Sequence, residues 1–267
     1  MSRILLTGAS SGIGQAIAKA LIASGHEVWG TSRDPGRIPE LPALHRLKLN
    51  LLDPQSIEQA FNSALAEAEH IDVLINNAGT GHFGPAESLP SDVVEKQFEL
   101  LVFAQIRMMQ RAIAAMRDSG GGLVINVTSL ASRLPVPFMA AYNAAKAAMA
   151  AYTMSIQLEL PDTQVRVVDL QPADICTDFN DAVIKTGEKD PRYETKLTKT
   201  WRAVDANMKA APKPELVARR VLALIQQKNP PPRVTVGDTF QSKIAPLIFR
   251  FLPQRVRIWG LKRYYKI

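Results

Sequence analysis

Short apolar runs alternate with amphipathic stretches along most of the chain. Apolar runs predict buried strands, and apolar residues three or four positions apart predict the helices between them. The expected strands are Ile4–Leu6, Glu27–Thr31, Leu44–Leu49, Asp72–Ile75, Leu123–Val127, Val165–Leu170 and Arg233–Val236. Strands that alternate with helices form parallel sheets covered on both faces. The pattern therefore predicts an α/β fold of the Rossmann type: a doubly wound parallel sheet of about seven strands with helices on both faces.

Two regions depart from this alternation. Residues 178–212 are polar, mixed in charge and weakly periodic, which predicts a substrate lid within a single dinucleotide-binding and catalytic domain, residues 1–237. Residues 238–267 form a basic, amphipathic C-terminal extension. Between the fourth and fifth strands, a long helix is expected from Ser91 to about Arg117, with Leu101 on its apolar stripe.

The charge of the chain is unevenly placed. The formal net charge is +7, and the residues from Gln241 onward contain seven basic side chains and no acidic one. The remaining chain has as many acidic as basic residues, so no nucleic-acid partner is expected. The extension also carries an apolar stripe at helical spacing: Ile244, Leu247, Ile248, Phe251 and Leu252. Contact with an anionic membrane surface and closure of a cleft or subunit interface are equally compatible with this stripe.

Cysteine and histidine are scarce. Cys176 is the one cysteine and the four histidines show no ligand spacing, so neither a disulfide nor a metal site is expected. Ser2-Arg3 leads straight into the first apolar run, so no signal peptide is expected, and a cytoplasmic location fits.

A glycine-rich turn joins the first strand to the first helix. Its sequence is Thr7-Gly8-Ala9-Ser10-Ser11-Gly12-Ile13-Gly14. Glycines permit positive φ and close backbone approach, and the amino end of a helix favours a phosphate group. In this position the turn indicates dinucleotide binding, and the absence of a following Gly-Lys-Ser/Thr argues against a nucleotide triphosphatase.

The end of the second strand bears on the choice of dinucleotide. In such folds it meets the adenosine ribose, where an acidic residue binds the 2′-hydroxyl and an arginine accommodates a 2′-phosphate. Ser32 and Arg33 come first here and favour NADP over NAD, although Asp34 follows directly.

Polar residues also follow the fourth and fifth strands. Asn76-Asn77-Ala78-Gly79 ends the fourth, and Ser129 follows the fifth, thirteen residues before Tyr142. Tyr142 and Lys146 lie on one helix face, and an ammonium close to a phenol favours the phenolate. Taken alone this spacing occurs by chance in many helices, so its weight comes from the motifs around it.

Together these motifs resemble the short-chain dehydrogenase/reductase family over residues 3 to about 237. The segment Phe251-Leu252-Pro253-Gln254-Arg255 is similar to members near the hydroxysteroid and retinol dehydrogenases. The resemblance implies three catalytic residues. Tyr142 would be the general acid in reduction and the general base in oxidation, Lys146 would lower its pKa and hold the nicotinamide ribose, and Ser129 would bind the substrate oxygen.

The resemblance also implies which residues bind the cofactor, NADP(H), and the substrate. The cofactor set is Gly8, Ser10, Ser11, Gly12, Ile13, Gly14, Ser32, Arg33, Asn50, Leu51, Asn77, Ala78, Gly79, Tyr142, Lys146, Pro172, Ile175 and Thr177. The expected substrate-lining residues are His82, Phe83, Leu130 and Phe138.

Three positions depart from the family pattern. Leu101 stands where the family usually has an asparagine that orders a water in the proton relay. Asn50 replaces an adenine-binding aspartate, and Ala173 replaces the glycine of a Pro-Gly pair, so the loop there is expected to take a slightly different path.

The leading hypothesis is an NADP(H)-dependent oxidoreductase that interconverts a carbonyl and a secondary alcohol on an apolar substrate, such as a lipid, steroid or retinoid. The alternative, motivated by Leu101, is an NADP-binding sensor or scaffold with weak or no catalysis. The family commonly dimerises through the long helix and the Tyr-Lys helix, and the small residues of Ala144–Ala151 suit such packing, so a homodimer or homotetramer is expected.

Overall fold

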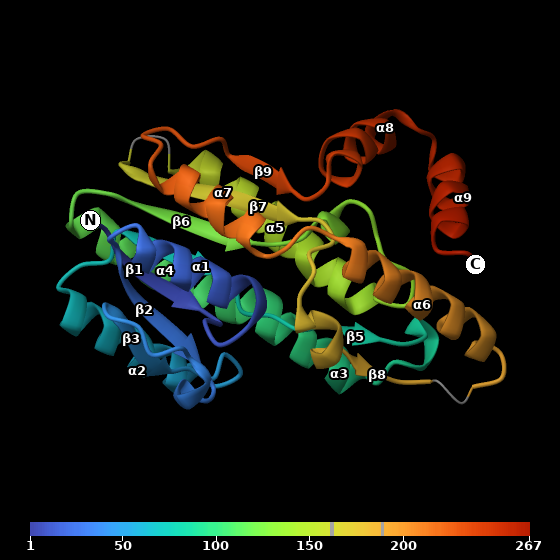
Figure 1. Ribbon diagram of the computed structural model, residues 1–267, viewed down its shortest axis with the longest axis horizontal. Helices are drawn as coiled ribbons and strands as arrows, with labels where there is room; N and C mark the ends of the chain where they lie inside the picture. Colours follow the sequence, from blue (N-terminus) through green and yellow to red (C-terminus); the bar gives the residue numbers. More distant parts are fainter. Residues whose placement is uncertain (161–162, 188–189) are drawn as a thin grey trace.

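Seven parallel strands form the central sheet of the computed structural model, which describes residues 1–160, 163–187 and 190–267 (Figure 1). The strands are β1 (Arg3–Thr7), β2 (Glu27–Ser32), β3 (Leu44–Lys48), β4 (Val73–Asn76), β6 (Gly122–Val127), β7 (Val165–Pro172) and β9 (Arg233–Val236). They lie in the order β3-β2-β1-β4-β6-β7-β9. This confirms the predicted Rossmann-type α/β fold. The order reverses at β1, which places a ligand crevice at the carboxyl ends of the strands.

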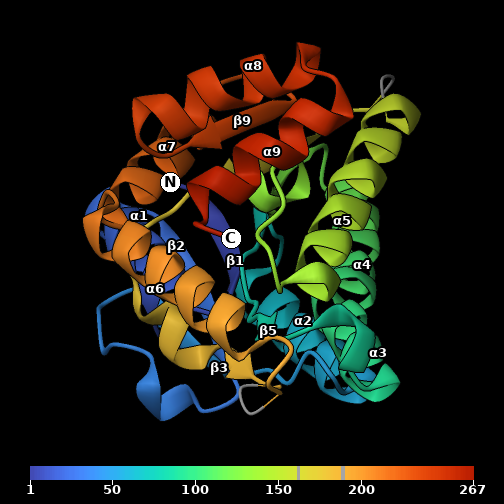
Figure 2. The ribbon, with the colours of Figure 1, turned by 90° about the vertical axis from the view of Figure 1, so that its right-hand side faces the viewer.

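Helices cover both faces of the sheet, as Figures 1 and 2 show. On one face, α1 (Gly12–Ala23) and α7 (Glu215–Ile225) pack in one apolar core with alternate residues of the strands. On the other face, α2 (Pro54–Ala68), α4 (Ala104–Asp118) and α5 (Ala140–Glu159) share a second core. Because strands such as β1 and β4 contribute side chains to both cores, they are apolar throughout, as expected of a covered parallel sheet.

The long helix expected from Ser91 is divided. It consists of α3 (Ser91–Phe98), a π-helical turn η3 (Glu99–Phe103) and α4. Leu101 lies in this turn, is fully buried, and belongs to a small core with Val102 and Ala145. Its assignment to the apolar stripe is therefore confirmed, as is the long helix, which runs from Ser91 to Asp118 and contains one π-helical turn.

Residues 178–212 contain more regular structure than their sequence suggests. They include η5 (Asp178–Ala182), β8 (Ile184–Lys185) and the helix α6 (Glu194–Ala210); residues 188–189 of the expected lid lie outside the described residues. The two-residue strand β8 pairs in parallel with β5 (His82–Phe83). Gly84 is required beside this pairing, because a Cβ there would lie 2.4 Å from Thr186 Oγ1.

The extension folds into the π-helical turn η6 (Phe240–Ile244) and two helices, α8 (Ala245–Phe251) and α9 (Gln254–Tyr264). Both helices stand at the carboxyl end of the sheet, beyond β9 (Figure 2). Three short 3₁₀ turns complete the described structure: η1 (Pro35–Arg37), η2 (Ala86–Ser88) and η4 (Leu130–Ser132). Within the described ranges, no helix combines the length and hydropathy needed to span a bilayer.

Candidate active site

A cavity of about 1670 Å³ lies at the carboxyl ends of the strands. It exceeds the roughly 300–1,000 Å³ of a typical small-molecule pocket, so it has room for a dinucleotide together with a second molecule. Sixteen residues predicted to bind the cofactor line it besides Tyr142 and Lys146: Gly8, Ser10, Ser11, Gly12, Ile13, Gly14, Ser32, Arg33, Asn50, Leu51, Asn77, Ala78, Gly79, Pro172, Ile175 and Thr177.

The glycine-rich turn is shaped by close backbone contacts. Gly8 and Gly12 have φ of +74° and +52°, and a Cβ on Gly14 would lie 2.0 Å from the Gly8 carbonyl oxygen. The N-cap residue of α1, Ser11, makes no side-chain hydrogen bond to the helix. Backbone N–H groups of the first turn therefore remain available to an anion at the positive end of the helix dipole. These features fit the pyrophosphate of a dinucleotide.

Asn77 and Thr7 hold this turn against β4. The Asn77 amide donates to the carbonyl oxygens of Thr7 (2.9 Å) and Gly8 (3.3 Å). The Thr7 hydroxyl accepts from the backbone N–H groups of Asn77 (2.9 Å) and Ala78 (3.0 Å). Asn77 thus braces the loop through its side chain. The role of Thr7 was not predicted, although its position at the end of the first strand was a signal.

At the end of β2, the acidic and the basic side chains face different surroundings. Asp34 turns back to its own chain, where its carboxylate accepts from the backbone N–H of Gly36 at 3.0 Å. Arg33 and Arg37 are exposed and line the cavity. Neither arginine has an acidic partner within 4.0 Å among the described residues. Two free guanidinium groups at this point suit a phosphate better than a ribose hydroxyl.

Ser129, Tyr142 and Lys146 meet at one wall of the same cavity. The Ser129 hydroxyl hydrogen-bonds the Tyr142 phenol, and its oxygen also accepts from the backbone N–H of Ala131 at 3.0 Å. Lys146 is buried, and its Nζ donates to the Val127 carbonyl oxygen at 2.8 Å and lies 5.9 Å from the centre of the Tyr142 ring. The carboxyl end of β6 and helix α5 thus bring together Ser129, Tyr142 and Lys146, which lie within 17 positions of one another in the sequence.

Burial dominates the ionisation of this group. Burial raises the pKa of Tyr142 to about 12, the bond from Ser129 lowers it, and the nearby charge of Asp174 raises it further. Burial also lowers the pKa of Lys146 to about 8, against the opposing effect of Asp169. Lys146 is not among the causes of this shift, so its lowering of the Tyr142 pKa stays a prediction, and in the protein alone the desolvation of the phenolate dominates.

Asp169 is a buried carboxylate near Lys146, and the sequence analysis did not include it among the site residues. It accepts from Gln171 Nε2 at 2.7 Å and Arg233 Nε at 2.9 Å, and from the Thr128 hydroxyl. A charged residue in the middle of the apolar run Val165–Leu170 was a signal, since a buried carboxylate needs partners. Its negative charge helps keep Lys146 protonated.

Leu101 lies behind Lys146. A Cβ on Gly79 would lie 2.8 Å from Leu101 Cδ2 and 3.9 Å from Lys146 Nζ. The leucine therefore fills the space beside the ammonium with apolar surface.

The predicted substrate-lining residues separate into two pairs. His82 and Leu130 line the cavity. Burial lowers the pKa of His82, whose Nε2 is 2.9 Å from Thr186 Oγ1, so it is a neutral link to the lid. Phe83 and Phe138 belong instead to an apolar core with Met139 and Leu197, and neither is among the residues that line the described cavity. Their placement is corrected to packing beneath the substrate region.

Aromatic rings connect the lid to the catalytic helix. Phe83 contacts Trp201 of α6 with ring centres 4.9 Å apart, and Phe138 contacts Tyr193 at 6.2 Å. Tyr142 itself packs on Phe179 of η5 at 5.9 Å. Phe138, which shortly precedes α5, has φ of +61°, a conformation that costs a bulky residue about 1 kcal/mol or more.

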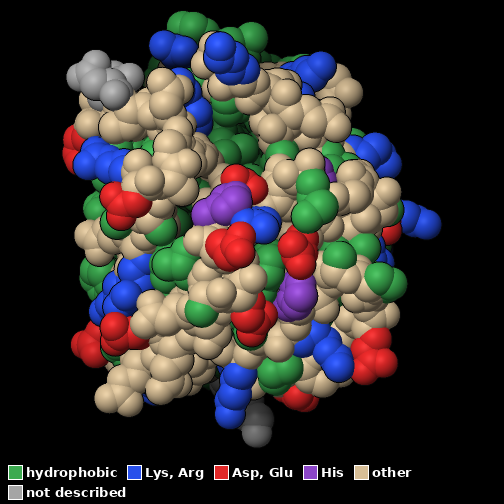
Figure 3. All heavy atoms as spheres, turned by 90° about the vertical axis from the view of Figure 1, so that its left-hand side faces the viewer, with side chains coloured by type: hydrophobic (Ala, Val, Ile, Leu, Met, Phe, Trp, Pro, Cys, Tyr) green, Lys and Arg blue, Asp and Glu red, His purple; other side chains and the backbone are tan. Residues whose placement is uncertain are grey.

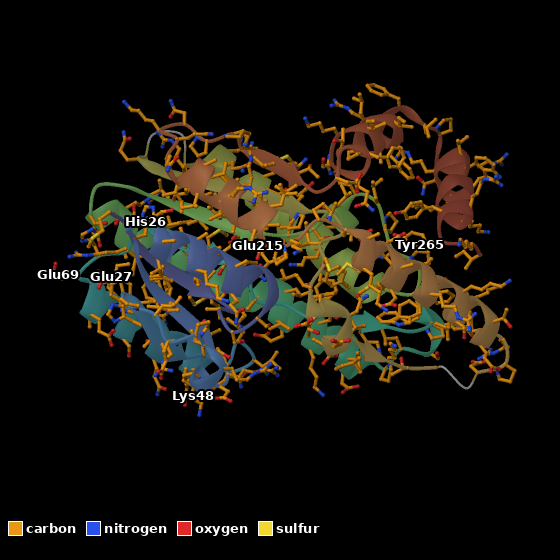
Figure 4. The ribbon with its side chains drawn as sticks, in the orientation of Figure 1. His26, Glu27, Lys48, Glu69, Glu215 and Tyr265 are labelled. Carbon is orange, nitrogen blue, oxygen red and sulfur yellow. The ribbon has the colours of Figure 1, made fainter. Side chains whose placement is uncertain are left out.

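The extension supplies another wall of the cavity. Phe249, Leu261, Tyr264 and the buried Tyr265 all line it, and Figure 4 labels Tyr265 at the end of α9, on the side of the extension that faces the body. The inner side of the extension therefore has the position expected for closing the cleft, one of the two roles considered for it.

Hydrogen bonds fix the extension to the loop after β7. Gln241 Nε2 donates to Asp174 at 2.6 Å and to the Tyr264 hydroxyl at 3.0 Å, and the Asp174 N–H donates to Gln241 Oε1 at 3.2 Å. The preceding Ala173 keeps an ordinary φ and donates to the Val236 carbonyl oxygen at 2.7 Å, which continues the contact of this loop with β9.

Comparisons with known proteins agree with this geometry. Residues 2–188 match the model of the family described as short chain dehydrogenase. The chain is 29% identical to a 3-ketodihydrosphingosine reductase of Bacteroides thetaiotaomicron over 99% of its own length and 98% of the relative's. It is 30% identical to an oxidoreductase of Schizosaccharomyces pombe over 88% of this chain and 82% of the other.

Solved structures show the same relation. A short-chain dehydrogenase from Streptomyces avermitilis superposes with a TM-score of 0.82 at 26% identity, covering 98% of this chain and 95% of the other. The protein belongs to the short-chain dehydrogenase family. It is accordingly an oxidoreductase of the carbonyl/alcohol type with a nucleotide-binding Rossmann fold.

The shape of the glycine-rich turn gives a first prediction. Gly14→Ala should weaken NADPH binding at least about tenfold, because the added Cβ collides with the Gly8 carbonyl and the Asn77 amide and displaces both. NADPH fluorescence titration measures the affinity, and circular dichroism checks the fold. The matched control is Gly260→Ala on α9, where an added Cβ meets nothing within 4 Å. Equal affinity of both variants and the wild type would contradict the assignment of this turn.

Asp174 gives a second prediction, on pH dependence. Its charge raises the pKa of Tyr142, so Asp174→Asn should lower that pKa while the amide oxygen still accepts from Gln241. Alcohol oxidation requires the phenolate, so the rise of kcat with pH should move to lower pH, by less than about one unit. Asp178→Asn, also at the cavity but absent from the influences on Tyr142, should leave the profile in place. A shift to higher pH would refute the coupling.

Proposed function

We propose that the protein is an NADP(H)-dependent oxidoreductase that interconverts a carbonyl group and a secondary alcohol on an apolar, lipid-like substrate. The observation that carries the proposal is the meeting of Ser129, Tyr142 and Lys146 at one wall of the cavity whose other end is the glycine-rich turn. A dinucleotide whose pyrophosphate is held at that turn would extend its nicotinamide toward the proton donor on α5, so that both would face one substrate group.

In this proposal the side chains divide the work of one proton transfer. Tyr142 is protonated at neutral pH because burial raises its pKa to about 12, and this is the form that donates a proton to a carbonyl oxygen. Ser129, already bonded to the phenol, donates to the same oxygen and stabilises its developing charge. The bound dinucleotide would supply the hydride and, when oxidised, a positive charge that lowers the pKa of Tyr142 for the reverse reaction.

Lys146 completes the proposed relay from the interior side. Its ammonium is anchored on the Val127 carbonyl and favoured by Asp169, and it lies close enough to hold a ribose hydroxyl. With Leu101 beside it, no side chain at that position can hold a relay water. A proton that leaves Tyr142 would therefore travel by way of the cofactor ribose and the cavity rather than through the π turn.

NADP is the proposed dinucleotide. Arg33 and Arg37 line the cavity without acidic partners among the described residues, while Asp34, the residue that would favour NAD, caps η1. Gly8 to Gly14 would hold the pyrophosphate, and Ile175 and Thr177 the carboxamide.

An apolar substrate is supported by the walls of the cavity beyond the nicotinamide position. Leu130, Val136, Met139, Phe179, Phe249 and Leu261 contribute apolar surface there. The relative from Bacteroides thetaiotaomicron carries a keto substrate in its name. We extend that class, a ketone on a lipid chain, to this protein.

We also propose that the protein is a homodimer or homotetramer and works in the cytoplasm. The exposed apolar residues Phe103, Met154 and Leu158 on η3 and α5 support an interface through the outer faces of α4 and α5. The single, free Cys176 suits a reducing compartment.

Removal of the phenol hydroxyl tests the chemistry. Tyr142→Phe should lower kcat at least about 10²–10⁴-fold, because the general acid is lost, while NADPH affinity stays within about twofold. The readouts are NADPH oxidation with a panel of long-chain ketones and a parallel fluorescence titration. Tyr152→Phe, the same change further along α5, is the matched control and should retain activity. A Tyr142→Phe variant that keeps its activity would contradict the assignment of Tyr142 as the general acid. Tight NADPH binding by the wild type with no turnover on any ketone or alcohol would favour the alternative of an NADP-binding sensor.

Replacement of Arg33 tests the dinucleotide. Arg33→Ala should weaken NADPH binding about 10–100-fold, the equivalent of a lost charge-assisted hydrogen bond, and change NADH binding little. Arg46→Ala is the control, since Arg46 lies on the neighbouring strand and pairs with Glu40 at 2.9 Å. Equal losses for NADPH and NADH would argue against a 2′-phosphate site.

A further inference from the structure

The outer side of the extension is strongly apolar. Ile244, Leu247, Phe251, Ile258 and Trp259, here called the tail surface, are each 44% or more exposed, and none of them lines the cavity. Phe251 is 75% and Trp259 is 65% exposed. Large apolar side chains gathered in this way on a folded surface mark a site of interaction rather than ordinary exposure.

The tail surface is not exposed because the extension is detached. Tyr265 is buried, Gln241 is bonded to Asp174, and Asn207 of α6 donates to the Tyr264 hydroxyl at 3.0 Å. The inner side of the extension is therefore held against the body by packing and hydrogen bonds. The outer side keeps its apolar residues in helical register: Ile244, Leu247 and Phe251 recur at intervals of three and four positions along η6 and α8.

Positive charge surrounds the tail surface. Seven basic residues lie between Gln241 and the last residue, with no acidic residue among them. None of the seven has a carboxylate within 4.0 Å in the described part of the chain. The opposite end of the molecule differs, because acidic, basic and histidine side chains are interspersed there (Figure 3).

This charge decides between two occupants. A second copy docked on the same surface would bring two sets of seven cations together, which is unfavourable at close range. The body carries no net negative charge that would offset this repulsion. An anionic bilayer satisfies both features at once, since lipid phosphates and carboxylates attract the cations while Trp259 and Phe251 enter the interfacial region.

We propose that the tail surface docks the protein on an anionic lipid bilayer, with α8 and α9 lying at the headgroup level. The same helices wall the cavity through Phe249, Leu261 and Tyr264. A docked protein would thus hold the apolar part of its cavity against the lipid phase. That consequence for substrate supply rests on the proposed function, whereas the docking does not.

Co-sedimentation with vesicles tests the proposal without any assay of activity. The wild type should bind vesicles of phosphatidylcholine with about a third phosphatidylserine at low salt, bind pure phosphatidylcholine at least tenfold more weakly, and be largely released at about 0.5 M NaCl. The double variant Phe251→Ser/Trp259→Ser should lose at least about tenfold in partitioning, because it removes the two largest exposed apolar groups.

The controls separate docking from general stickiness. Leu158→Ser on α5 removes an apolar residue that is 76% exposed, close to the 75% of Phe251, and lies away from the extension. It should leave vesicle binding unchanged in a sample whose oligomeric state, measured by light scattering, equals that of the wild type. Circular dichroism and NADPH titration confirm that each variant is folded.

Three outcomes would overturn the proposal. These are a wild type that stays in the supernatant with anionic vesicles, a double variant that binds like the wild type, and a double variant whose only change is a smaller oligomer by light scattering. The last result would assign the tail surface to a second copy. If docking holds and every ketone fails as a substrate, the proposed function fails alone.

Discussion

The burial of the Lys146 ammonium is the constraint around which the site is arranged. A lysine deprived of water needs compensating partners, and here they are the Val127 carbonyl at the end of β6 and the charge of Asp169 in β7. Asp169 in turn is held by Gln171, Arg233 and Thr128. The charged group therefore ties α5 to three neighbouring strands, and Tyr142, one turn earlier on the same helix, is positioned by the same anchoring.

Chemistry and substrate choice are assigned to different parts of the chain. The proposed catalytic group and the glycine-rich turn rest on the middle of the sheet, where β1, β4 and β6 each pair with two neighbouring strands. The proposed substrate end is formed by η5, α6, α8 and α9, which pack on the sheet end through aromatic rings and a few hydrogen bonds. The second part can change its shape at little cost to the first, which is how one fold serves many substrates.

Much of the fold and of the cofactor site could be predicted from the sequence, because both depend on local signals. Apolar runs indicated the seven strands, Gly8 and Gly14 are required by contacts with neighbouring backbone, and Gly12 is favoured by its positive φ. The secondary structure of the expected lid, residues 178–212, could not be predicted from such local signals. The buried stripe of α6 is Leu197, Thr200 and Ala203, whose small and polar members give almost no hydrophobic contrast.

The other features that were not predicted from the sequence depend on long-range packing. The π turn at Leu101 leaves no mark in a helical sequence, and the pairing of β5 with β8 joins segments about 100 residues apart. The ionisation of Tyr142 also depends on long-range packing. Its sequence neighbours report the lysine four residues away, whereas the desolvation that dominates its pKa comes from the assembled cavity.

The aromatic contacts of Phe138 have a consequence for how the molecule opens. Phe138 is held in a left-handed conformation by packing between Phe83 and Tyr193, and it lies immediately before the helix that carries Tyr142. Loss of that packing would release the strained backbone at the same time as the lid. The lid and the first turn of α5 therefore belong to one cooperative unit of local unfolding, with a shared opening free energy and shared amide-exchange protection.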